Sequence, residues 1–221
     1  MRAVLLDALG TLLRLEDPVP ALRRELAARG IEVDEPVARA AMRAEIAYYR
    51  AHNLEGSDRA ALAGLRRRCA EVLRDALGTG TTGAVHEALL AALSFVAHPD
   101  ALPALERLRA TGLRTVVVSN WDVSLHERLA ETGIAARVDG AVVSAELGVA
   151  KPDPAIFAHA LTMAGATPEQ TIHVGDSPEA DVAGARAAGI RPVLIVRSGT
   201  APREPGLTTI SSLAELSALV E

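Results

Sequence analysis

The chain has 221 residues, of which 49% are hydrophobic and 2% are aromatic, and its formal net charge at pH 7 is −5. This size and hydrophobicity allow one generous domain, or one domain with an insertion, whereas the acidic balance excludes attachment to nucleic acid or to an anionic membrane by bulk electrostatics. Cys69 is the only cysteine, so an intramolecular disulfide is excluded and a reducing compartment is expected.

The first predicted element is a short apolar strand that ends at Asp7, after which Gly10 and Thr11 turn the chain. The acid interrupts the apolar run at once, so we expect neither a signal peptide nor a membrane span, and we expect a cytoplasmic protein. An ionised carboxylate is costly to bury without partners. Asp7 is therefore predicted to be a nucleophile or a metal ligand at the carboxyl end of a parallel sheet.

Beyond this strand the pattern becomes helical. Helix starts are predicted at Asp17, at Asp34 and at Asp58, and Gly30 marks a helix end. Apolar side chains recur at helical spacing and form faces that can pack together. These side chains are Val37, Ala41, Ala44 and Tyr48, and Leu62, Leu65, Cys69 and Val72. We therefore predict a small helical bundle over residues 15–96, inserted after the first strand.

Strands and helices alternate in the second half of the chain. The predicted strands are L-R-T-V-V-V-S, R-V-D-G-A-V-V-S, T-I-H-V-G-D and P-V-L-I-V, with helices that run through Leu129, begin after Pro154 and run through Ala187. Near-continuous Val and Ile runs are typical of parallel strands buried on both faces. We predict an α/β fold with a Rossmann-like doubly wound parallel sheet over residues 1–14 plus 97–221, with R-S-G-T-A-P-R-E-P-G as a loop.

Two further acids are expected near Asp7. Asp176 leaves the end of the strand T-I-H-V-G-D, and Asp181 follows on the first turn of the next helix, so both can point into one cleft. Carboxylate oxygens are the ligands that Mg²⁺ prefers, usually together with several waters. The sequence therefore predicts a Mg²⁺ site at this edge of the sheet.

Four motifs, each after a predicted strand, resemble those of the haloacid dehalogenase-like hydrolase superfamily. They are D-A-L-G-T-L, V-V-V-S-N, G-V-A-K-P-D-P and H-V-G-D-S-P-E-A-D. The resemblance spans the chain and implies a catalytic core with a helical cap. It implies that Asp7 attacks phosphorus, that Ser119 and a neighbouring amide hold a phosphoryl oxygen, and that Lys151 neutralises the anions. Thr11 and Asn120 are implied as substrate-binding residues.

Leu9 departs from the family pattern. Phosphatase members carry D-x-D-G-T, in which the second Asp protonates the leaving alcohol and later activates water. The family metal is held by Asp7, by Asp176 and by the backbone carbonyl of residue 9, which Leu9 still supplies, with Asp181 as a further candidate. General acid–base catalysis is lost at Leu9, and it is worth roughly 10²- to 10⁴-fold in rate, or about 3 to 5.5 kcal/mol of barrier.

Three hypotheses about function follow. The favoured one is a Mg²⁺-dependent phosphatase acting on a small phosphorylated metabolite through an aspartyl-phosphate on Asp7. The second is a 2-haloacid dehalogenase, because that branch also lacks the second Asp; its fourth motif, however, lacks the acid found here as Asp176. Two close carboxylates repel unless a cation lies between them, which favours the phosphatase. The third is a non-catalytic relative that binds a phosphorylated ligand or a partner protein.

The helical bundle is expected to select the substrate. Its segment M-R-A-E-I-A-Y-Y-R-A-H-N gathers polar and aromatic side chains. Arg43 or Arg50 can bind a substrate anion, and Tyr49 or His52 can donate the missing proton. Arg43 and Tyr49 are the candidate substrate-binding residues. Trp121 is expected to narrow the pocket or to pack beneath the cap, and His173 to be a core histidine. We expect a small-molecule substrate, no nucleic-acid or membrane partner, and a monomer or homodimer.

Overall fold

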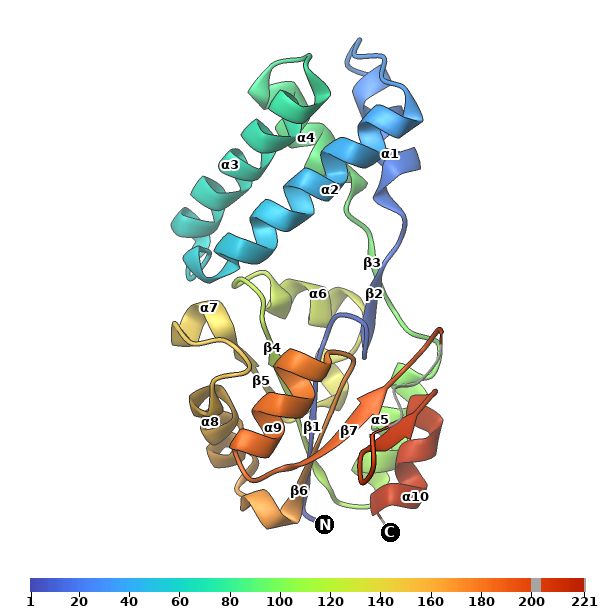
Figure 1. Ribbon diagram of the computed structural model, residues 1–221, viewed down its shortest axis with the longest axis vertical. Coiled ribbons are helices and arrows are strands. Elements are labelled where there is room, and N and C mark those ends of the chain that lie inside the picture. The colour runs from blue at the N-terminus through green and yellow to red at the C-terminus, as the bar shows by residue number, and fades with distance from the viewer. Residues whose placement is uncertain (200–203, 221) are drawn as a thin grey trace. The chain divides into compact units, whose positions relative to one another are not determined.

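The computed structural model describes residues 1–199 and 204–220, and the chain divides into two compact units (Figure 1). The first comprises Met1–Arg14 and the chain from Val96 onward, and the second comprises Leu15–Phe95. The second boundary thus falls one residue before the predicted one. None of the helices within the described residues is long and apolar enough to cross a membrane.

The first unit is built on a parallel sheet, which confirms the predicted α/β Rossmann-like class. Among the described residues this sheet has six strands in the order β5-β4-β1-β6-β7-β8, and each neighbouring pair is parallel. The chain runs outward from β1 to β5 on one side and returns through β6 on the other, so the order reverses beside β1, where ligands of such folds bind. The strands are β1 (Ala3–Leu6), β4 (Arg114–Ser119), β5 (Gly140–Val143), β6 (Thr171–Gly175), β7 (Arg191–Ile195) and β8 (Thr208–Ile210).

Helices cover this sheet and bury the alternating apolar side chains of its strands. On one face, Leu5 of β1 and Val118 of β4 share a buried cluster with Ile156 and Phe157 of α8. On β4, α5 also makes contacts, and α10 packs against α5. The helices of this unit are α5 (Ala101–Ala110), α6 (Leu125–Glu131), α7 (Ser144–Leu147), α8 (Pro154–Ala164), α9 (Gly184–Ala187) and α10 (Leu216–Val220).

The second unit is a helical bundle with its own apolar core. Asp17 and Asp58 accept hydrogen bonds from backbone amides at the starts of α1 and α3, as predicted for helix caps, and α2 begins directly after Asp34. Buried side chains from all four helices form one cluster, which includes Leu22, Met42, Leu73 and Leu89. The helices are α1 (Pro18–Ala27), α2 (Glu35–His52), α3 (Arg59–Leu77) and α4 (Thr82–Ala92).

Some elements differ from the sequence-based expectations. The helix expected through Ala187 begins instead with a π-helical segment, Pro178–Ala183, followed by the short α9. The strand pair β2 (Leu13–Leu15) and β3 (Phe95–Ala97), as well as β8 and α10, was not predicted. Short 3-10 helices lie at Asn53–Glu55, Ala135–Arg137, Pro168–Gln170 and Leu213–Glu215. Part of the predicted loop R-S-G-T-A-P-R-E-P-G, residues 200–203, lies outside the described residues.

Candidate functional site

The predicted catalytic side chains stand at one edge of the sheet. Asp7 follows β1, Ser119 ends β4 and Asp176 follows β6, and these three strands are neighbours in the order β4-β1-β6. The amide of Asp7 donates to the Val174 carbonyl at 2.9 Å, which continues the β1 and β6 pairing to the strand ends. Parallel register therefore brings side chains far apart in sequence to the same edge.

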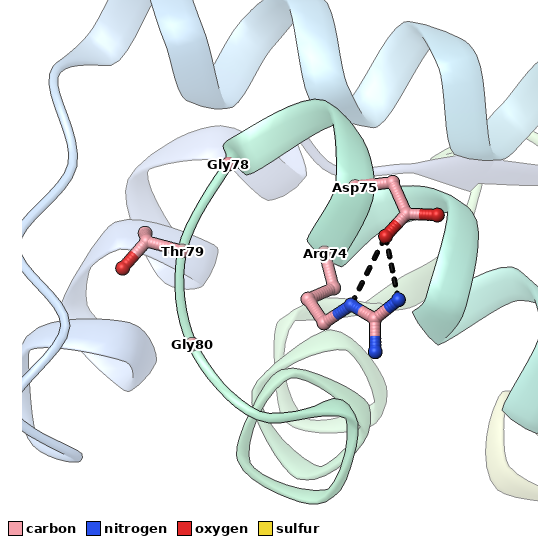
Figure 2. A pocket seen from close by; sticks show the side chains of 5 residues that line it. All are labelled: Arg74, Asp75, Gly78, Thr79 and Gly80. Carbon is pink, nitrogen blue, oxygen red and sulfur yellow. Dashed lines mark hydrogen bonds and ion pairs between the residues drawn. The ribbon is translucent and has the colours of Figure 1, made fainter.

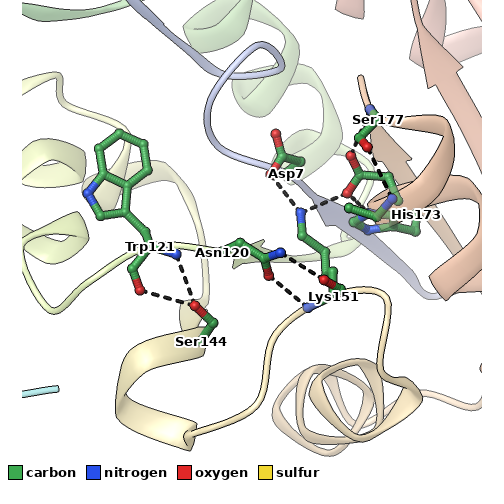
Figure 3. A network of polar contacts seen from close by, with 9 residues as sticks. Asp7, Asn120, Trp121, Ser144, Lys151, His173 and Ser177 are labelled. Atoms are coloured by element: carbon green, nitrogen blue, oxygen red, sulfur yellow. Dashed lines mark hydrogen bonds and ion pairs between the residues drawn. The ribbon is translucent and has the colours of Figure 1, made fainter. Parts of the chain in front are cut away.

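Lys151 is the electrostatic centre of this edge (Figure 3). Its ammonium donates to Asp7 Oδ1 at 2.6 Å and to Asp181 Oδ1 at 2.7 Å, and all three side chains are buried. Burial raises the pKa of Asp7 to about 7, and the Lys151 charge acts against this rise. Burial also works against the charge of Lys151, but the two carboxylates outweigh it and hold the Lys151 pKa above its ordinary value.

Asp181 is fixed from a second side by His173 and Ser177. Its Oδ1 accepts from His173 Nε2 at 2.8 Å, and its Oδ2 accepts from the Ser177 amide at 3.0 Å. Burial opposes the charge of Asp181, yet Lys151 and His173 outweigh burial and hold the Asp181 pKa below its usual range. Burial likewise lowers the pKa of His173, so a neutral imidazole donates its Nε2 proton to the carboxylate.

His173 is a buried core side chain, as expected, but its contact with Asp181 was not foreseen. The ring is fully buried and packs edge-on against Phe157, with centroids 5.0 Å apart at 86°. The only sequence signal is the spacing of His173 and Asp181 within H-V-G-D-S-P-E-A-D. Gly175 lies between them, and a Cβ there would stand 2.1 Å from Asp181 Cγ, so a larger residue would displace the acid.

Three carboxylates gather around a point suited to a cation. One oxygen from each of Asp7, Asp176 and Asp181 lies within 4.8 Å of the others, and Asp7 Oδ2 is buried with no hydrogen-bond partner among the described residues. Gly10 has φ of +92°, and a Cβ on it would stand 2.1 Å from Asp176 Oδ2. The donor set is all oxygen and exceeds the single nearby ammonium in charge, so the residues present fit a hard divalent cation.

Asn120 and Thr11 have surroundings that differ from those expected of residues that only contact a substrate. The Asn120 carboxamide donates to the Lys151 carbonyl at 2.8 Å and accepts from the Lys151 amide at 2.7 Å, so it clamps the backbone that carries the ammonium. Thr11 is fully buried, and its hydroxyl has no hydrogen-bond partner among the described residues. Substrate binding by either residue stays a prediction, as does phosphoryl binding by Ser119, which is 2% exposed.

Trp121 is pinned within the first unit directly after this clamp (Figure 3). Its amide donates to Ser144 Oγ at 3.0 Å, and the Ser144 hydroxyl lies 3.2 Å from the Trp121 carbonyl, to which it donates. The Trp121 side chain is buried. Ser144 therefore fixes the Trp121 backbone. Whether the buried indole narrows a substrate pocket or packs beneath the cap stays a prediction.

The candidate residues of the second unit lie on α2. Arg43 is exposed, whereas Tyr49 is partly buried against the apolar cluster of the bundle. The neighbouring Tyr48 ring stacks on His52 at 4.0 Å, and its hydroxyl accepts from Arg68 Nε at 3.1 Å. His52 is thus engaged within the bundle, and a substrate-binding role for Arg43 or Tyr49 stays a prediction.

A hollow in the second unit, at the end of α3, is less suited to chemistry (Figure 2). It has a volume of about 330 Å³ and is lined by Arg74, Asp75, Gly78, Thr79 and Gly80. The Arg74 guanidinium is already engaged, with Nη2 2.6 Å from Asp75 Oδ1 and Nη1 2.7 Å from Thr82 Oγ1. A charge-paired arginine beside two glycines leaves this hollow without the convergent polar groups of an active site.

An aspartate, a serine, a lysine and two further acids thus meet at the carboxyl ends of the parallel strands of an α/β fold. The chain belongs to the haloacid dehalogenase-like hydrolase family, whose model matches residues 1–189.

Curated relatives match the chain over part of its length. Over 109 residues the chain is 38% identical to a phosphoserine phosphatase of Thermus thermophilus, covering 49% of this chain and 43% of the relative. It is also 38% identical over 109 residues to a glyceraldehyde 3-phosphate phosphatase of Methanopyrus kandleri, covering 49% and 47%. The chain thus spans less than half the length of these relatives.

Solved structures match the whole fold. A haloacid dehalogenase-like phosphatase of Thermococcus onnurineus is similar with a TM-score of 0.67 and 25% identity, over 100% of this chain and 98% of that one. A 2-haloacid dehalogenase of Pseudomonas syringae pv. Tomato is similar with a TM-score of 0.67 and 27% identity over the same shares. Both enzyme activities that the sequence left open are thus named among the similar structures.

Proposed function

We propose that this protein is a Mg²⁺-dependent phosphatase that hydrolyses a small phosphorylated metabolite with Asp7 as the nucleophile. The observation that carries the proposal is the gathering of three carboxylates around one lysine, with Asp7 Oδ2 buried and unpartnered within the described residues. Three carboxylates this close together repel one another and need more positive charge than the Lys151 ammonium supplies. The phosphatase names of the curated relatives support the same activity.

The proposed chemistry begins with an ionised Asp7. Its Oδ2 forms a bond to phosphorus while the bond from phosphorus to the ester oxygen breaks, and water then hydrolyses the aspartyl-phosphate. The Lys151 ammonium, 2.6 Å from Asp7 Oδ1, favours the ionised carboxylate and offsets the charge of the substrate. Ser119 is proposed to hold a phosphoryl oxygen. The departing oxygen needs a proton that Leu9 cannot give.

Asp7, Asp176 and the Leu9 carbonyl are proposed to hold Mg²⁺, which supplies charge neutralisation at the phosphoryl group when it is bound. Asp181 is a further candidate ligand, although its two oxygens already accept from Lys151, His173 and the Ser177 amide. Its contribution is therefore proposed to be the orientation of Lys151. An Asp176→Asn variant should weaken Mg²⁺ binding more than an Asp181→Asn variant, as measured by calorimetric titration.

The second unit is proposed to select the substrate, as a cap domain. Arg43 is exposed on α2 and can offer a fixed positive charge to a substrate anion. In this role Arg43→Ala and Tyr49→Phe should raise KM more than they lower kcat. Arg66→Ala, on α3, serves as a matched control with the same loss of charge.

A dehalogenase is the second candidate, because Leu9 removes the acid that halide does not need and because a 2-haloacid dehalogenase is among the similar structures. A panel of phosphate esters and 2-haloacids, each assayed with Mg²⁺ and with EDTA, separates the two. Phosphate release that needs Mg²⁺ and disappears in Asp7→Asn supports the phosphatase. Metal-independent halide release overturns it in favour of the dehalogenase.

A non-catalytic relative is the third candidate, and it explains Leu9 simply. The same panel tests it by thermal unfolding. A phosphorylated compound that raises the melting temperature without being turned over identifies a binding protein, because a ligand stabilises the state that it binds.

A further inference from the structure

Arg197, just beyond β7, has no part in the proposed mechanism, yet it joins the loop after β1 to the start of α5. Its Nε donates to the Gly10 carbonyl at 3.1 Å, and its Nη2 donates to the Thr11 carbonyl at 2.5 Å. The same guanidinium donates from Nη1 and Nη2 to the two carboxylate oxygens of Asp100, at 3.1 and 3.0 Å. All three nitrogens of the guanidinium are thus engaged.

The carbonyls that Arg197 holds belong to the loop that carries the nucleophile. Gly10 and Thr11 follow Asp7 by only three and four residues. Within the loop, the Gly10 amide donates to the Leu13 carbonyl at 2.7 Å and the Leu13 amide donates to the Ala8 carbonyl at 2.7 Å. From outside the loop, the His98 amide donates to the Leu12 carbonyl at 2.8 Å. The Arg197 guanidinium is the side chain from a distant part of the chain that holds the Gly10 and Thr11 carbonyls.

Asp100, at the start of α5, fixes the other side of the guanidinium. Besides Arg197 it accepts from Ser212 Oγ at 2.7 Å and from the Leu213 amide at 2.9 Å. Burial opposes the charge of Asp100, but Arg197 and these two donors outweigh it and lower the Asp100 pKa to about 2. The ion pair is largely shielded, with 20% and 18% of the two side chains exposed, so its geometry is held more firmly than that of a surface pair.

We propose that Arg197 is a positioning residue, oriented by Asp100, that holds the Gly10 and Thr11 carbonyls and thereby sets the place of the Asp7 carboxylate and the Leu9 carbonyl. The effect on catalysis rests on the proposed function of Asp7 as nucleophile, whereas the effect on the loop does not. The tight approach of Gly10 to Asp176 leaves the loop little room to shift without disturbing both acids.

The guanidinium is suited to this task because of its shape. Its planar fork can meet a carboxylate with two parallel bonds while the remaining edge meets two carbonyls, and a lysine ammonium cannot reproduce this geometry. Displacement of a catalytic group by about 1 Å can cost roughly 100-fold in rate. Loss of Arg197 should therefore be felt in the rate of the chemical step more than in substrate affinity.

The test compares Arg197→Ala with Arg191→Ala. Arg191 begins β7, the strand that precedes Arg197. It also donates to a backbone carbonyl, that of Leu219, at 3.0 Å, but it does not hold the loop. We expect Arg197→Ala to lower kcat by about 10- to 100-fold with KM within about threefold, and Arg191→Ala to leave both near wild type. Free guanidinium, well below unfolding concentrations, should restore part of kcat to Arg197→Ala alone.

Hydrogen exchange gives a readout that does not depend on activity. The amides of Gly10, Leu12 and Leu13 are bonded within the loop, and a peptide covering residues 7–13 reports its opening. Exchange in this peptide should be faster in Arg197→Ala than in wild type or Arg191→Ala. Arg197→Lys should lie between wild type and Arg197→Ala in both exchange and kcat, and Asp100→Asn should loosen the same peptide.

The outcomes separate this inference from the proposed function. Unchanged exchange over residues 7–13 in Arg197→Ala overturns the positioning role, whatever the activity. A fall in kcat that matches only the loss of folded protein, with no guanidinium recovery, also overturns it. If the wild-type protein hydrolyses no phosphate ester but the loop opens in Arg197→Ala and Asp100→Asn, the proposed function fails while the positioning of the loop by Arg197 stands.

Discussion

Asp7 in the first unit and Glu45 in the second are both buried acids, and burial raises the pKa of each to about 7. Their surroundings differ. At Asp7 the group that opposes burial is the Lys151 ammonium, and two further carboxylates lie nearby. At Glu45, on α2, the opposing group is the Cys69 thiol of α3, a weak hydrogen-bond donor.

This difference is what the proposed function requires of the two acids. A buried carboxylate beside an ammonium, in a cluster of acids that fits a cation, can be ionised when substrate is bound. The ammonium and the cation then offset the desolvation cost of its charge. A buried carboxylate within a helical bundle, opposed by a thiol alone, has no neighbouring charge to offset its ionisation. A raised pKa by itself therefore does not identify a catalytic group; the identity and spacing of the surrounding charges do.

The largest expected effect is that of Asp7→Asn. Removing the nucleophile should lower the turnover of every phosphate substrate by at least about 10⁴-fold, measured as steady-state phosphate release. The melting temperature should change little, because Lys151 keeps Asp181 as a partner and the amide has a smaller desolvation cost than the buried carboxylate. Substantial remaining turnover would contradict the assignment of Asp7. The matching Glu45→Gln variant should keep its activity.

Leu9→Asp restores the acid that the family places two residues after the nucleophile. It should raise the turnover of an unactivated alkyl phosphate by roughly 10²- to 10⁴-fold, and that of p-nitrophenyl phosphate by much less, because nitrophenolate leaves without a proton. Leu9→Asn is the matched control, with the same size and no acid. Equal changes on both esters, or none, would count against a missing general acid.

Lys151→Met tests whether the buried carboxylates of Asp7 and Asp181 are stabilised by the Lys151 ammonium. Asp7 and Asp181 would lose their shared partner, and breaking a buried ion pair on one side costs about 3 to 5 kcal/mol of unfolding free energy. Urea unfolding measures this loss, and adding Asp7→Asn should recover part of it. Arg114→Met breaks a half-exposed pair with Asp139 and should cost no more than about 1 kcal/mol.

Much of the first unit could be predicted from sequence because its signals are local. Parallel strands buried on both faces give continuous Val and Ile runs, and the acids at their ends stand out against them. The parallel sheet and the family were both confirmed. The π-helical start at Pro178–Ala183 was missed, because helical spacing in a sequence does not distinguish a π-helix from an α-helix; in the structure this segment carries Asp181, which contacts Lys151, His173 and Ser177.

The remaining features depend on partners that are distant in sequence. Arg197 meets Gly10 across 187 positions and Asp100 across 97, and no periodicity marks such a pair. The Asn120 clamp on the Lys151 backbone is likewise invisible before the fold is known, although both residues were singled out. Glu45 was not singled out either, since one acid on an Arg- and Glu-rich helix is normally solvated.

The smallest effect, and the sharpest test of the comparison, is the pH dependence that Glu45 gives to stability. Its pKa rises from 4.5 in the unfolded chain to about 7 in the folded protein, so the folded state binds the proton more tightly. The stability that Glu45 contributes is therefore fully present below pH 4.5 and is lost as the pH rises through about 7. The side chain of Glu45→Gln cannot ionise. As the pH rises from 4.5 to about 7, the free energy of unfolding of this variant should therefore increase relative to that of wild type by up to about 3 kcal/mol.

Urea unfolding of wild type and Glu45→Gln across this range measures the difference, and the contribution of Asp7 cancels because both proteins carry it. Repeating the comparison in the Asp7→Asn background should give the same difference, since the two acids lie in separate units. If the free energies of unfolding of wild type and Glu45→Gln differ by the same amount at every pH, Glu45 has the same pKa in the folded bundle as in the unfolded chain. Burial in the second unit would then not be enough to hold a proton on an acid, and the contrast with Asp7 would rest on solvent access rather than on neighbouring charge.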